Sequence, residues 1–388
     1  MTAINNKDLV ILSNIEWDFQ WQRHQIFATF FKKACRKVVF VESQAKRNPE
    51  FKDIPRIIER SLRFLTKRGR KEPSREKNGA NSNLSIISPL LLPSTFEVFR
   101  HINKKIFIPP LVRSIRREIT DAPIVVNYTP TQTSKDLIKS LDPLLVVYDC
   151  VENFPDFPGV AKDTAEIESA IIDEADLVVT DSIFLFEKAK KIRDDVIRIL
   201  PGVDYAHFER ADTGKLKNPP RRLCYFGGVH ERRIDLKLLE ELASSQKFTI
   251  EIVGPVKSKI PPFPENVIFH GAVPYQRLPQ TIKHCDCFIL PYRLSEFTKG
   301  ILPAKLFECF ASGKPIIATP LPSFYEFSEL IFLAESSDEW IKTLSSMFTL
   351  ESEQKYLERK ALARKNSWES RFEEFSNALA QRSRTSED

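Results

Sequence analysis

The residues best suited to chemistry stand around a predicted helix start at Lys305. An apolar run, residues 287–290, is followed by a polar loop, residues 293–303, and then by a helix pattern with Lys305 and Glu308 in its first turns. A second apolar run follows the helix at once. Strand, loop, helix and strand in this order form a unit of a parallel sheet, whose ligands bind where strand ends meet helix starts.

Lys305 and Glu308 together suit a nucleotide-sugar. A helix start offers backbone N–H groups and the positive end of the helix dipole, and the Lys305 ammonium adds a full charge for a diphosphate. Glu308 lies one turn further along the same helix face, where its carboxylate can accept hydrogen bonds from a ribose diol. The competing interpretation is an ordinary i,i+3 salt bridge on a helix surface, worth only ~0.3 kcal/mol.

Further short motifs accompany this segment in a fixed order. In chain order they are Trp17-Asp18, QRHQ at 22–25, VYDCVENF at 147–154, EADLV at 174–178 with Asp181-Ser182, LPGVD at 200–204, YFGG at 225–228, ERRID at 231–235 and VGP at 253–255. Together with the segment around Lys305, they resemble the bacterial GT-B-fold glycosyltransferases that build cell-surface polysaccharides, in particular the teichuronic-acid enzymes. The resemblance covers nearly the whole chain.

The resemblance and the alternation of strand and helix patterns predict an α/β fold of two Rossmann-like domains facing a cleft. We expect residues 1–214 to form an acceptor-binding N-terminal domain and residues 215–349 to form a domain that binds the nucleotide-sugar donor. Residues 350–388 are expected to form a C-terminal helix that crosses back to the N-terminal domain, with Trp368 and Phe372 as its packing face.

The donor side is predicted from glycines, basic residues and the loop before Lys305. Gly227-Gly228 follows a predicted strand, where glycine lets the backbone approach a phosphate closely; the competing interpretation is a simple strand-to-helix turn. The spacing is not G-x-G-x-x-G, which counts against a dehydrogenase. The predicted donor-binding residues are Gly227, Gly228, Arg232, Arg233, Gly254, Tyr292, Thr298, Lys299, Gly300, Lys305 and Glu308.

The catalytic candidates are Glu152, then Asp149, then His24. A direct displacement needs a base that takes the proton of the acceptor hydroxyl, and Asp149 ends a predicted strand of the N-terminal sheet. In a related inverting family an Asp occupies the position that aligns with Glu152. The competing interpretation is that Asp149 caps a turn and Glu152 sits on a solvated loop. Asp18 and Arg23 are predicted contacts on the acceptor side.

Two features concern stereochemistry and metals. Many retaining members of the family carry a Glu eight residues before the second carboxylate; Gly300 stands there in this chain, so inverting and retaining transfer both stay open. No D-x-D signature follows a strand, and the six cysteines lack the paired spacing of a zinc site. We therefore expect no metal and no cofactor, and we expect free, buried thiols in a reducing compartment.

Composition places the chain among soluble globular proteins. Of 388 residues, 42% are hydrophobic and 28% charged, and no apolar run approaches the ~20 residues that span a membrane. The net charge of +6 is concentrated in an insertion at residues 46–83, where residues 54–68 read as a basic amphipathic helix. We expect residues 54–77 to bind an anionic membrane surface, or else to form a solvated helix packed on its own domain. No nucleic-acid-binding motif is present.

The sequence therefore predicts a cytoplasmic hexosyltransferase, peripheral on the inner face of the cell membrane. It would move a sugar from a nucleotide-diphospho-sugar to a glycan acceptor, lipid-linked as in the resembled family, in surface polysaccharide biosynthesis and without a metal. Two alternatives stay open: a nucleotide-sugar epimerase of the same fold, and a non-catalytic module that binds a membrane or a partner. The sequence specifies neither the donor base and sugar nor the acceptor, the linkage or the oligomeric state.

Overall fold

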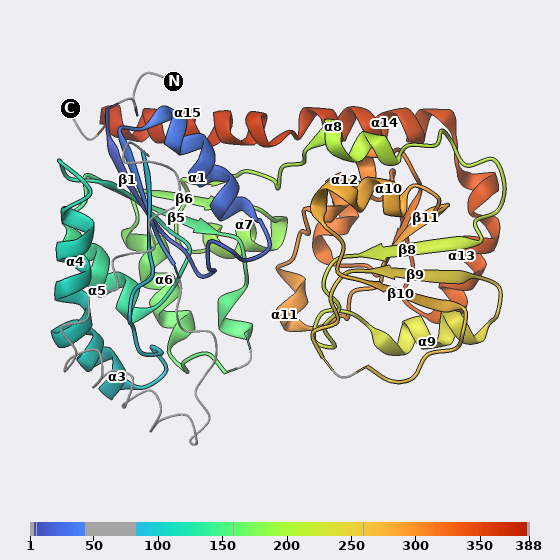
Figure 1. Cartoon of the computed structure of the whole chain (residues 1–388), viewed down its shortest axis with the longest axis horizontal. Helices are drawn as coiled ribbons and strands as arrows, with labels where there is room; N and C mark the ends of the chain where they lie inside the picture. Colours follow the sequence, from blue (N-terminus) through green and yellow to red (C-terminus); the bar gives the residue numbers. More distant parts are fainter. Residues whose placement is uncertain (1–3, 5, 43–82, 158, 259, 386–388) are drawn as a thin grey trace. The chain divides into compact units, whose positions relative to one another are not determined.

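The computed structural model describes residue 4 and residues 6–42, 83–157, 159–258 and 260–385. The chain divides into two compact units (Figure 1). Unit 1 comprises Met1–Asp181, Leu185–Ile199 and Phe372–Asp388, and unit 2 comprises Ser182–Phe184 and Leu200–Arg371. The predicted basic helix at 54–68, and nearly all of the insertion that contains it, lie outside the described residues.

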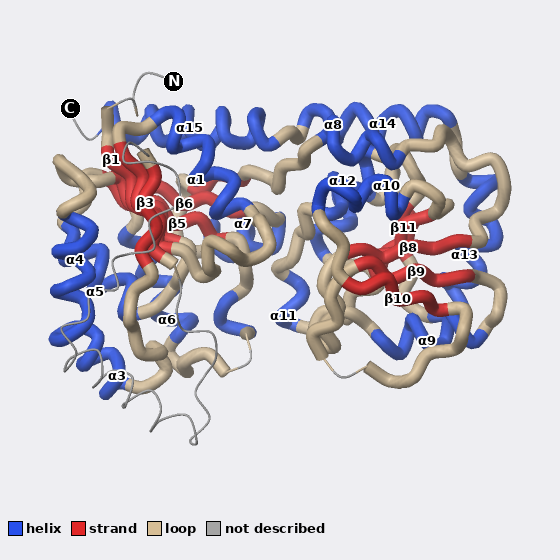
Figure 2. Tube along the Cα trace, viewed as in Figure 1, coloured by secondary structure: helices blue, strands red, loops and turns tan. Residues whose placement is uncertain are grey.

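Unit 1 is built on a seven-stranded parallel sheet with the strand order β3-β2-β1-β4-β5-β6-β7 (Figure 2). Its strands are β1 (Asp8–Leu12), β2 (Lys37–Val41), β3 (Leu84–Ile87), β4 (Ile124–Asn127), β5 (Leu145–Cys150), β6 (Leu177–Thr180) and β7 (Val196–Arg198). Most of these strand residues are buried, because helices cover both faces of the sheet. The order reverses between β1 and β4, which makes this pair the switch point of the sheet.

The helices of unit 1 alternate with the strands, as the sequence predicts. They are α1 (Arg23–Ala34), α3 (Glu97–Ile102), α4 (Ile108–Arg116), α5 (Gln132–Leu141), α6 (Thr164–Glu174) and α7 (Ile183–Lys190), the last from Leu185 onward. A π-helical turn, Asn103–Phe107, joins α3 to α4, and Pro109 and Pro110 lie in the first turn of α4, where a missing N–H is tolerated.

Unit 2 holds a second parallel sheet of six strands in the order β10-β9-β8-β11-β12-β13. The strands are β8 (Arg222–Phe226), β9 (Thr249–Val253), β10 (Val267–Gly271), β11 (Cys287–Leu290), β12 (Ile316–Ala318) and β13 (Phe332–Leu333). Strands β8 and β11 are paired although β9 and β10 lie between them in sequence. The β8–β11 pair is therefore the switch point of this sheet.

The helices of unit 2 lie on both faces of its sheet. They are α8 (Tyr205–Phe208), α9 (Leu236–Ser244), α10 (Leu278–Ile282), α11 (Glu296–Lys299), α12 (Lys305–Ala311), α13 (Ser337–Leu350), α14 (Glu353–Lys365) and the start of α15 (Trp368–Thr385). Helix α9 contacts α13 on one face, and α12 contacts α8 and α14 on the other (Figure 1). The doubly wound α/β class predicted for both halves is thus confirmed.

The sequence predicts one C-terminal helix within residues 350–388, whereas the structure has two in this range, α14 and α15. The break falls at Asn366, whose side-chain amide donates to the Leu362 carbonyl at 2.7 Å. The Asn366 carbonyl in turn accepts the Val203 N–H at 2.9 Å. Ser367 then accepts the Ser370 N–H at the start of α15. An amide that satisfies the last carbonyls of a helix ends it locally, which the apolar pattern does not reveal.

The division between the units differs from the predicted boundaries at 214 and 349. Apart from the short segment Ser182–Phe184, unit 2 begins at Leu200, because Phe208 and Ala211 are buried in the core of that unit. Unit 2 also keeps the chain as far as Arg371. Within unit 1, the Phe372 ring of α15 lies 4.9 Å from that of Phe31, and the Phe375 ring lies 5.3 Å from that of Phe27.

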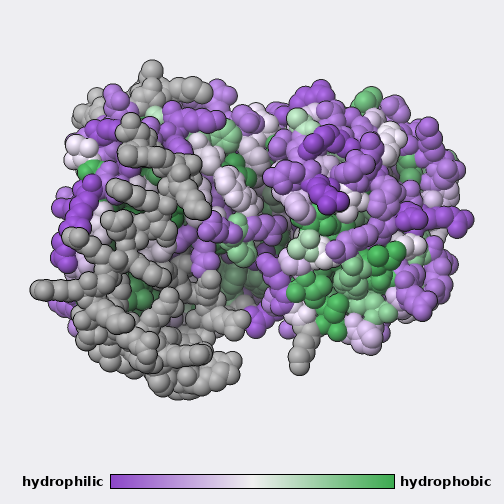
Figure 3. Space-filling view, viewed as in Figure 1, coloured by the Kyte–Doolittle hydropathy of each residue, from purple (hydrophilic) through white to green (hydrophobic). Residues whose placement is uncertain are grey.

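The surface and the cysteines bear on the remaining expectations. No helix in the described ranges is long and apolar enough to cross a bilayer. All six cysteines are buried and free, as predicted. Strand β10 is an edge strand that exposes Ile268 and Phe269, and Figure 3 shows hydrophobic residues gathered on the visible face of unit 2.

Candidate functional site

The residues with chemistry in unit 2 come together at the switch point of its sheet. Gly227 directly follows β8, Gly254 directly follows β9, and Tyr292 lies two residues after the end of β11. Helix α12 begins at Lys305, after the loop that leaves β11. The carboxyl ends of parallel strands meet at one edge of a sheet, so these segments surround one site.

Two glycines at this edge pack backbone against backbone. Gly227 has a φ of 122° and Gly254 a φ of 150°, conformations that residues with a side chain rarely adopt. The Gly227 N–H donates to the Val253 carbonyl at 2.8 Å. A Cβ on Gly254 would lie 2.1 Å from the Gly227 oxygen, so that position has no room for a side chain. The turn after β8 is therefore fixed by its neighbour on β9.

The Lys305 ammonium lies against this glycine turn. Its Nζ donates a hydrogen bond of 2.9 Å to the Tyr225 hydroxyl and stands 4.3 Å from the centre of the Tyr225 ring. A Cβ on Gly227 would lie only 2.6 Å from Nζ. Burial lowers the pKa of Lys305, but the neighbouring phenols of Tyr225 and Tyr292 outweigh it and leave the pKa raised. The amine thus stays charged at neutral pH.

Glu308 lies one turn along α12 from Lys305 and is half-buried. Burial raises the pKa of its carboxyl to about 7, although Lys305 acts in the opposite direction. In the described part of the chain, no hydrogen bond or ion pair engages this carboxylate; the Lys305 ammonium bonds to Tyr225 instead. The i,i+3 salt bridge that was the competing interpretation is therefore not formed, and both groups remain available to a ligand.

Several other predicted donor residues shape the loop before α12. Tyr292 is only 4% exposed, and its ring contacts Lys305 and Phe324, so it supports the ammonium from the core side. Thr298 is fully buried, and its hydroxyl donates to the Arg293 carbonyl at 2.5 Å. The Lys299 ammonium forms an ion pair of 2.5 Å with Glu296 on the surface. These contacts give the three side chains structural partners.

The remaining donor-side predictions are Gly228, Arg232, Arg233 and Gly300. Gly228 follows Gly227, and the nearest side-chain atom to a Cβ there would be the Lys257 Cε at 3.5 Å. Arg232 is exposed, while the Arg233 guanidinium lies 5.3 Å from the Phe297 ring centre. Gly300 is buried directly after α11. The donor role of each residue stays a prediction.

Unit 1 contains a second set of ionisable groups, buried beside the switch point of its own sheet. Asp149 near the end of β5 is fully buried and forms an ion pair of 2.8 Å with Arg23 at the start of α1. The Arg23 guanidinium also donates to the Ile199 carbonyl at 2.9 Å and lies 4.7 Å from the centre of the Phe27 ring. Arg23 is therefore held inside unit 1, and the acceptor contact predicted for it has to compete with these partners.

His24 is buried next to this pair. Its Nδ1 shares a hydrogen bond of 2.9 Å with the Ser13 hydroxyl, and its ring stacks on Tyr128 at 3.7 Å. Burial, with Arg23 nearby, lowers the pKa of His24 to about 3. The imidazole is therefore neutral at physiological pH, and it can accept a proton only if the site opens or rearranges.

Asp181 and Tyr128 complete the cluster, and the sequence reasoning did not select either of them. Burial raises the pKa of Asp181 well above its usual range, with Arg23 opposing and Asp149 and Glu152 adding to the rise. Asp181 stands in the Asp181-Ser182 motif that carries the family resemblance, directly after an apolar run, but nothing local indicates that it is buried beside Arg23. Glu152 lies on the half-buried loop after β5, and Asp18 is exposed. Unit 1 thus offers several carboxylates with contrasting surroundings.

Comparison with known proteins gives a family match in unit 2. Residues 220–349 match the family described as "Glycosyl transferases group 1". The "Putative teichuronic acid biosynthesis glycosyltransferase TuaH" of Bacillus subtilis (strain 168) is 27% identical over 233 residues, which are 53% of this chain and 57% of that protein. The chain thus spans little more than half the length of this relative. The match confirms, for residues 220–349, the glycosyltransferase resemblance seen in the sequence.

Solved structures match over almost the whole chain. The sucrose-phosphate synthase tll1590 of Thermosynechococcus elongatus has a TM-score of 0.65 at 14% identity, over 97% of this chain and 99% of that chain. Anabaena Alr3699/HepE, solved in complex with UDP-glucose, has a TM-score of 0.66 at 12% identity, over 97% of this chain and 100% of that chain. At these identities the likeness shows the fold, which is the predicted GT-B fold.

Proposed function

We propose that this protein is a glycosyltransferase that takes a sugar from a nucleotide-diphospho-sugar and passes it to a glycan acceptor. The family match of residues 220–349 supports the transferase class. The name of the Bacillus relative supports a place in surface polysaccharide assembly, and the UDP-glucose bound to HepE supports a nucleotide-sugar donor.

The observation that carries the proposal is the Lys305 ammonium set against the Gly227 turn. The bare backbone of Gly227 lets a phosphate approach, and the half-buried ammonium supplies the charge that a diphosphate requires. Partial burial strengthens this attraction, because the surrounding dielectric is lower than that of water. Glu308, one turn away, would accept hydrogen bonds from the ribose hydroxyls.

We propose that the transfer needs no divalent cation. A departing nucleoside diphosphate carries negative charge that must be neutralised as the bond to the sugar breaks. The Lys305 ammonium supplies a fixed positive charge for this purpose. A metal would have to share the same phosphate oxygens with the ammonium.

The acceptor side is proposed to lie on unit 1. Glu152 would take the proton of the acceptor hydroxyl. Asp149, which is paired with Arg23, is the second candidate for this base. A lipid-linked acceptor, and a peripheral position on the inner face of the membrane through residues 54–77, extend the proposal. They rest on the basic sequence of that segment and on the resemblance to the polysaccharide enzymes.

The test is a thermal-shift panel with UDP, GDP, CDP, TDP and their sugars. One nucleotide should stabilise the wild type, by about 2.7 kcal/mol at 100 times its Kd, and should fail to stabilise Lys305→Ala. Lys237→Ala is the matched control, because Lys237 lies on α9 in the same unit and is 84% exposed.

Each outcome has a defined meaning. A shift that is retained in Lys305→Ala would refute the assignment of the phosphate site. No shift with any nucleotide would favour the non-catalytic module. Conversion of one nucleotide-sugar into another without an acceptor, detected by chromatography, would identify the epimerase alternative.

A further inference from the structure

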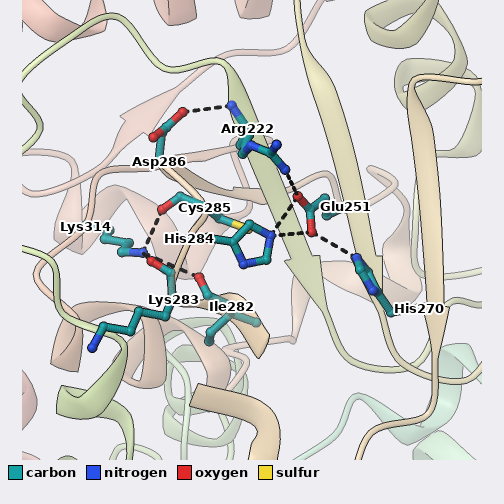
Figure 4. A network of polar contacts seen from close by, with 9 residues as sticks. All are labelled: Arg222, Glu251, His270, Ile282, Lys283, His284, Cys285, Asp286 and Lys314. Carbon is teal, nitrogen blue, oxygen red and sulfur yellow. Dashed lines mark hydrogen bonds and ion pairs between the residues drawn. The ribbon is translucent and has the colours of Figure 1, made fainter. Parts of the chain in front are cut away.

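A cluster of side chains that could hold a metal ion lies in unit 2 (Figure 4). Glu251 comes from the middle of β9 and His270 from β10, while His284 and Cys285 lie between α10 and β11. In Figure 4 the two imidazoles approach the Glu251 carboxylate from different sides. Residues from three separate segments of the chain therefore converge on one buried carboxylate.

The distances are those of a compact ligand set. The Nε2 of His284 lies 2.9 Å and 2.8 Å from the two oxygens of Glu251, and the Nε2 of His270 lies 2.9 Å from Oε2. Ligand atoms of Glu251, His284 and Cys285 all lie within 4.8 Å of one another. Glu251 and Cys285 are almost fully buried, whereas the two histidines reach the surface and leave a path for an ion.

The loop that carries His284 and Cys285 is held by a buried lysine. The Lys314 ammonium, only 2% exposed, donates to the carbonyls of Ile282, Lys283 and Cys285, the last at 2.6 Å (Figure 4). This bonding ties down the turn after α10 from the adjoining strand segment. The backbone that carries His284 and Cys285 is thus held before any ion arrives, which lowers the cost of ordering these two ligands.

We propose that Glu251, His284 and Cys285, with His270 as the fourth ligand, form a zinc site. Carboxylate oxygen, imidazole nitrogen and thiolate sulfur are the ligand types that zinc takes in tetrahedral sites. One thiolate and one carboxylate balance the charge of the ion, so the filled site is neutral before Arg222 is counted. Four protein ligands make a closed, structural site rather than a catalytic one.

Binding would rearrange protons and one arginine. The Cys285 thiol gives its proton to solvent as the sulfur–zinc bond forms. Each imidazole now donates its Nε2–H to Glu251, so this proton must leave for solvent and Nδ1 must take one up, which frees the Nε2 lone pair for the ion. The Arg222 guanidinium now lies 3.0 Å from Oε1 of Glu251 and is 53% exposed. It can leave for solvent, where Asp286 lies beside its backbone. Metal affinity should consequently rise with pH.

The position of the site suggests what the ion would do. Gly254 follows Glu251 by three residues, and Gly271 follows His270 directly. An ion that ties β9, β10 and the α10–β11 turn together would fix the strand that leads to Gly254. Zinc would thus support the edge of the sheet that carries the donor glycines, without touching the donor.

The experiment measures zinc and cobalt binding to the full chain. Protein purified without chelator, dialysed against Zn²⁺ and then against metal-free buffer, should retain one equivalent by mass spectrometry of metals. Co²⁺ should give visible tetrahedral bands and a thiolate-to-metal charge-transfer band. Cys285→Ser and Glu251→Gln should each weaken affinity by more than about 100-fold, since even outer partners of a ligand contribute 10–100-fold.

The control is His101→Ala, an exposed histidine on α3 that should leave binding unchanged. Circular dichroism checks that each variant is folded, and a loss of the charge-transfer band in Cys285→Ser alone would still identify the sulfur ligand. The proposal is overturned if the wild type retains no metal. It is equally overturned if zinc binds Cys285→Ser and Glu251→Gln as tightly as it binds the wild type.

Discussion

Replacing Gly227 with alanine should disturb both the fold and the phosphate site. The φ of 122° alone costs a residue with a side chain about 1–3 kcal/mol. The new Cβ would also lie 2.6 Å from the Lys305 Nζ and 3.3 Å from its Cε, so the ammonium must move. The lost hydrogen bond to Tyr225 adds about 0.5–1.5 kcal/mol. The free energy of unfolding should therefore fall by about 1.5–4.5 kcal/mol.

Nucleotide binding should weaken by a separate amount. A hydrogen bond from a charged group is worth about 1.5–3 kcal/mol, so moving Lys305 away from the diphosphate should raise the Kd by about 10- to 150-fold. Isothermal titration with the nucleotide found in the thermal-shift panel gives the Kd, and urea unfolding gives the stability.

The matched control is Gly214→Ala in the same unit. Gly214 has a φ of 81°, but a Cβ there would meet nothing within 4 Å. The free energy of unfolding of this variant should fall only by the backbone contribution, about 1–2 kcal/mol, and the variant should bind the nucleotide as the wild type does. If Gly227→Ala binds the nucleotide with unchanged Kd while losing stability, the proposed contact between the phosphate and Lys305 is refuted.

Three further predictions concern named carboxylates and a buried arginine. The pKa of Glu308 is about 7 in the fold against 4.5 ordinarily, so its ionisation opposes folding. The stability of Glu308→Gln relative to the wild type should therefore increase as pH rises from about 5 to about 8. An equal difference in melting temperature between the two proteins at both pH values would contradict this. The affinity of the wild type for the donor should also rise over this pH range, whereas isothermal titration should show no such rise in affinity for Glu308→Gln. Glu152→Gln should slow sugar transfer by about 100-fold or more, measured as initial rate, while nucleotide affinity stays unchanged; an unchanged rate would remove Glu152 from the role of base. Arg359→Met should lower the free energy of unfolding by about 3–5 kcal/mol, because the Arg359 guanidinium is fully buried and bonded to Glu351; a loss below about 1 kcal/mol in urea unfolding would contradict this.

Local patterns in the sequence predicted the parts of the fold that depend on neighbouring residues. The apolar runs before Gly227 and before Tyr292 became β8 and β11, and the helix pattern at Lys305 became α12. The same patterns placed Lys305 and Glu308 one turn apart. Short-range periodicity is sufficient for such features, because they follow from the geometry of single elements.

Features that depend on partners distant in sequence were missed. The Arg23–Asp149 pair joins residues 126 positions apart and exists only because β1, β4 and β5 are neighbours in the sheet. Tyr225 begins the YFGG motif, yet nothing local shows that its hydroxyl faces Lys305, 80 positions later. The hydrogen bond that the Thr298 hydroxyl donates to the Arg293 carbonyl within its own loop is likewise not visible in the sequence. Burial and pairing of this kind are set by tertiary structure, not by residue type.

The most direct test of the central claim is a transfer assay with labelled nucleotide-sugars and a lipid-linked oligosaccharide acceptor. The wild type should move label from one nucleotide-sugar into the organic phase and release one nucleoside diphosphate for each sugar transferred. Chelator should leave the rate of transfer unchanged even if it lowers the melting temperature, and Lys305→Ala should abolish transfer. A protein that binds a nucleoside diphosphate through Lys305, yet forms no glycosylated product with any donor in the panel, would contradict the claim.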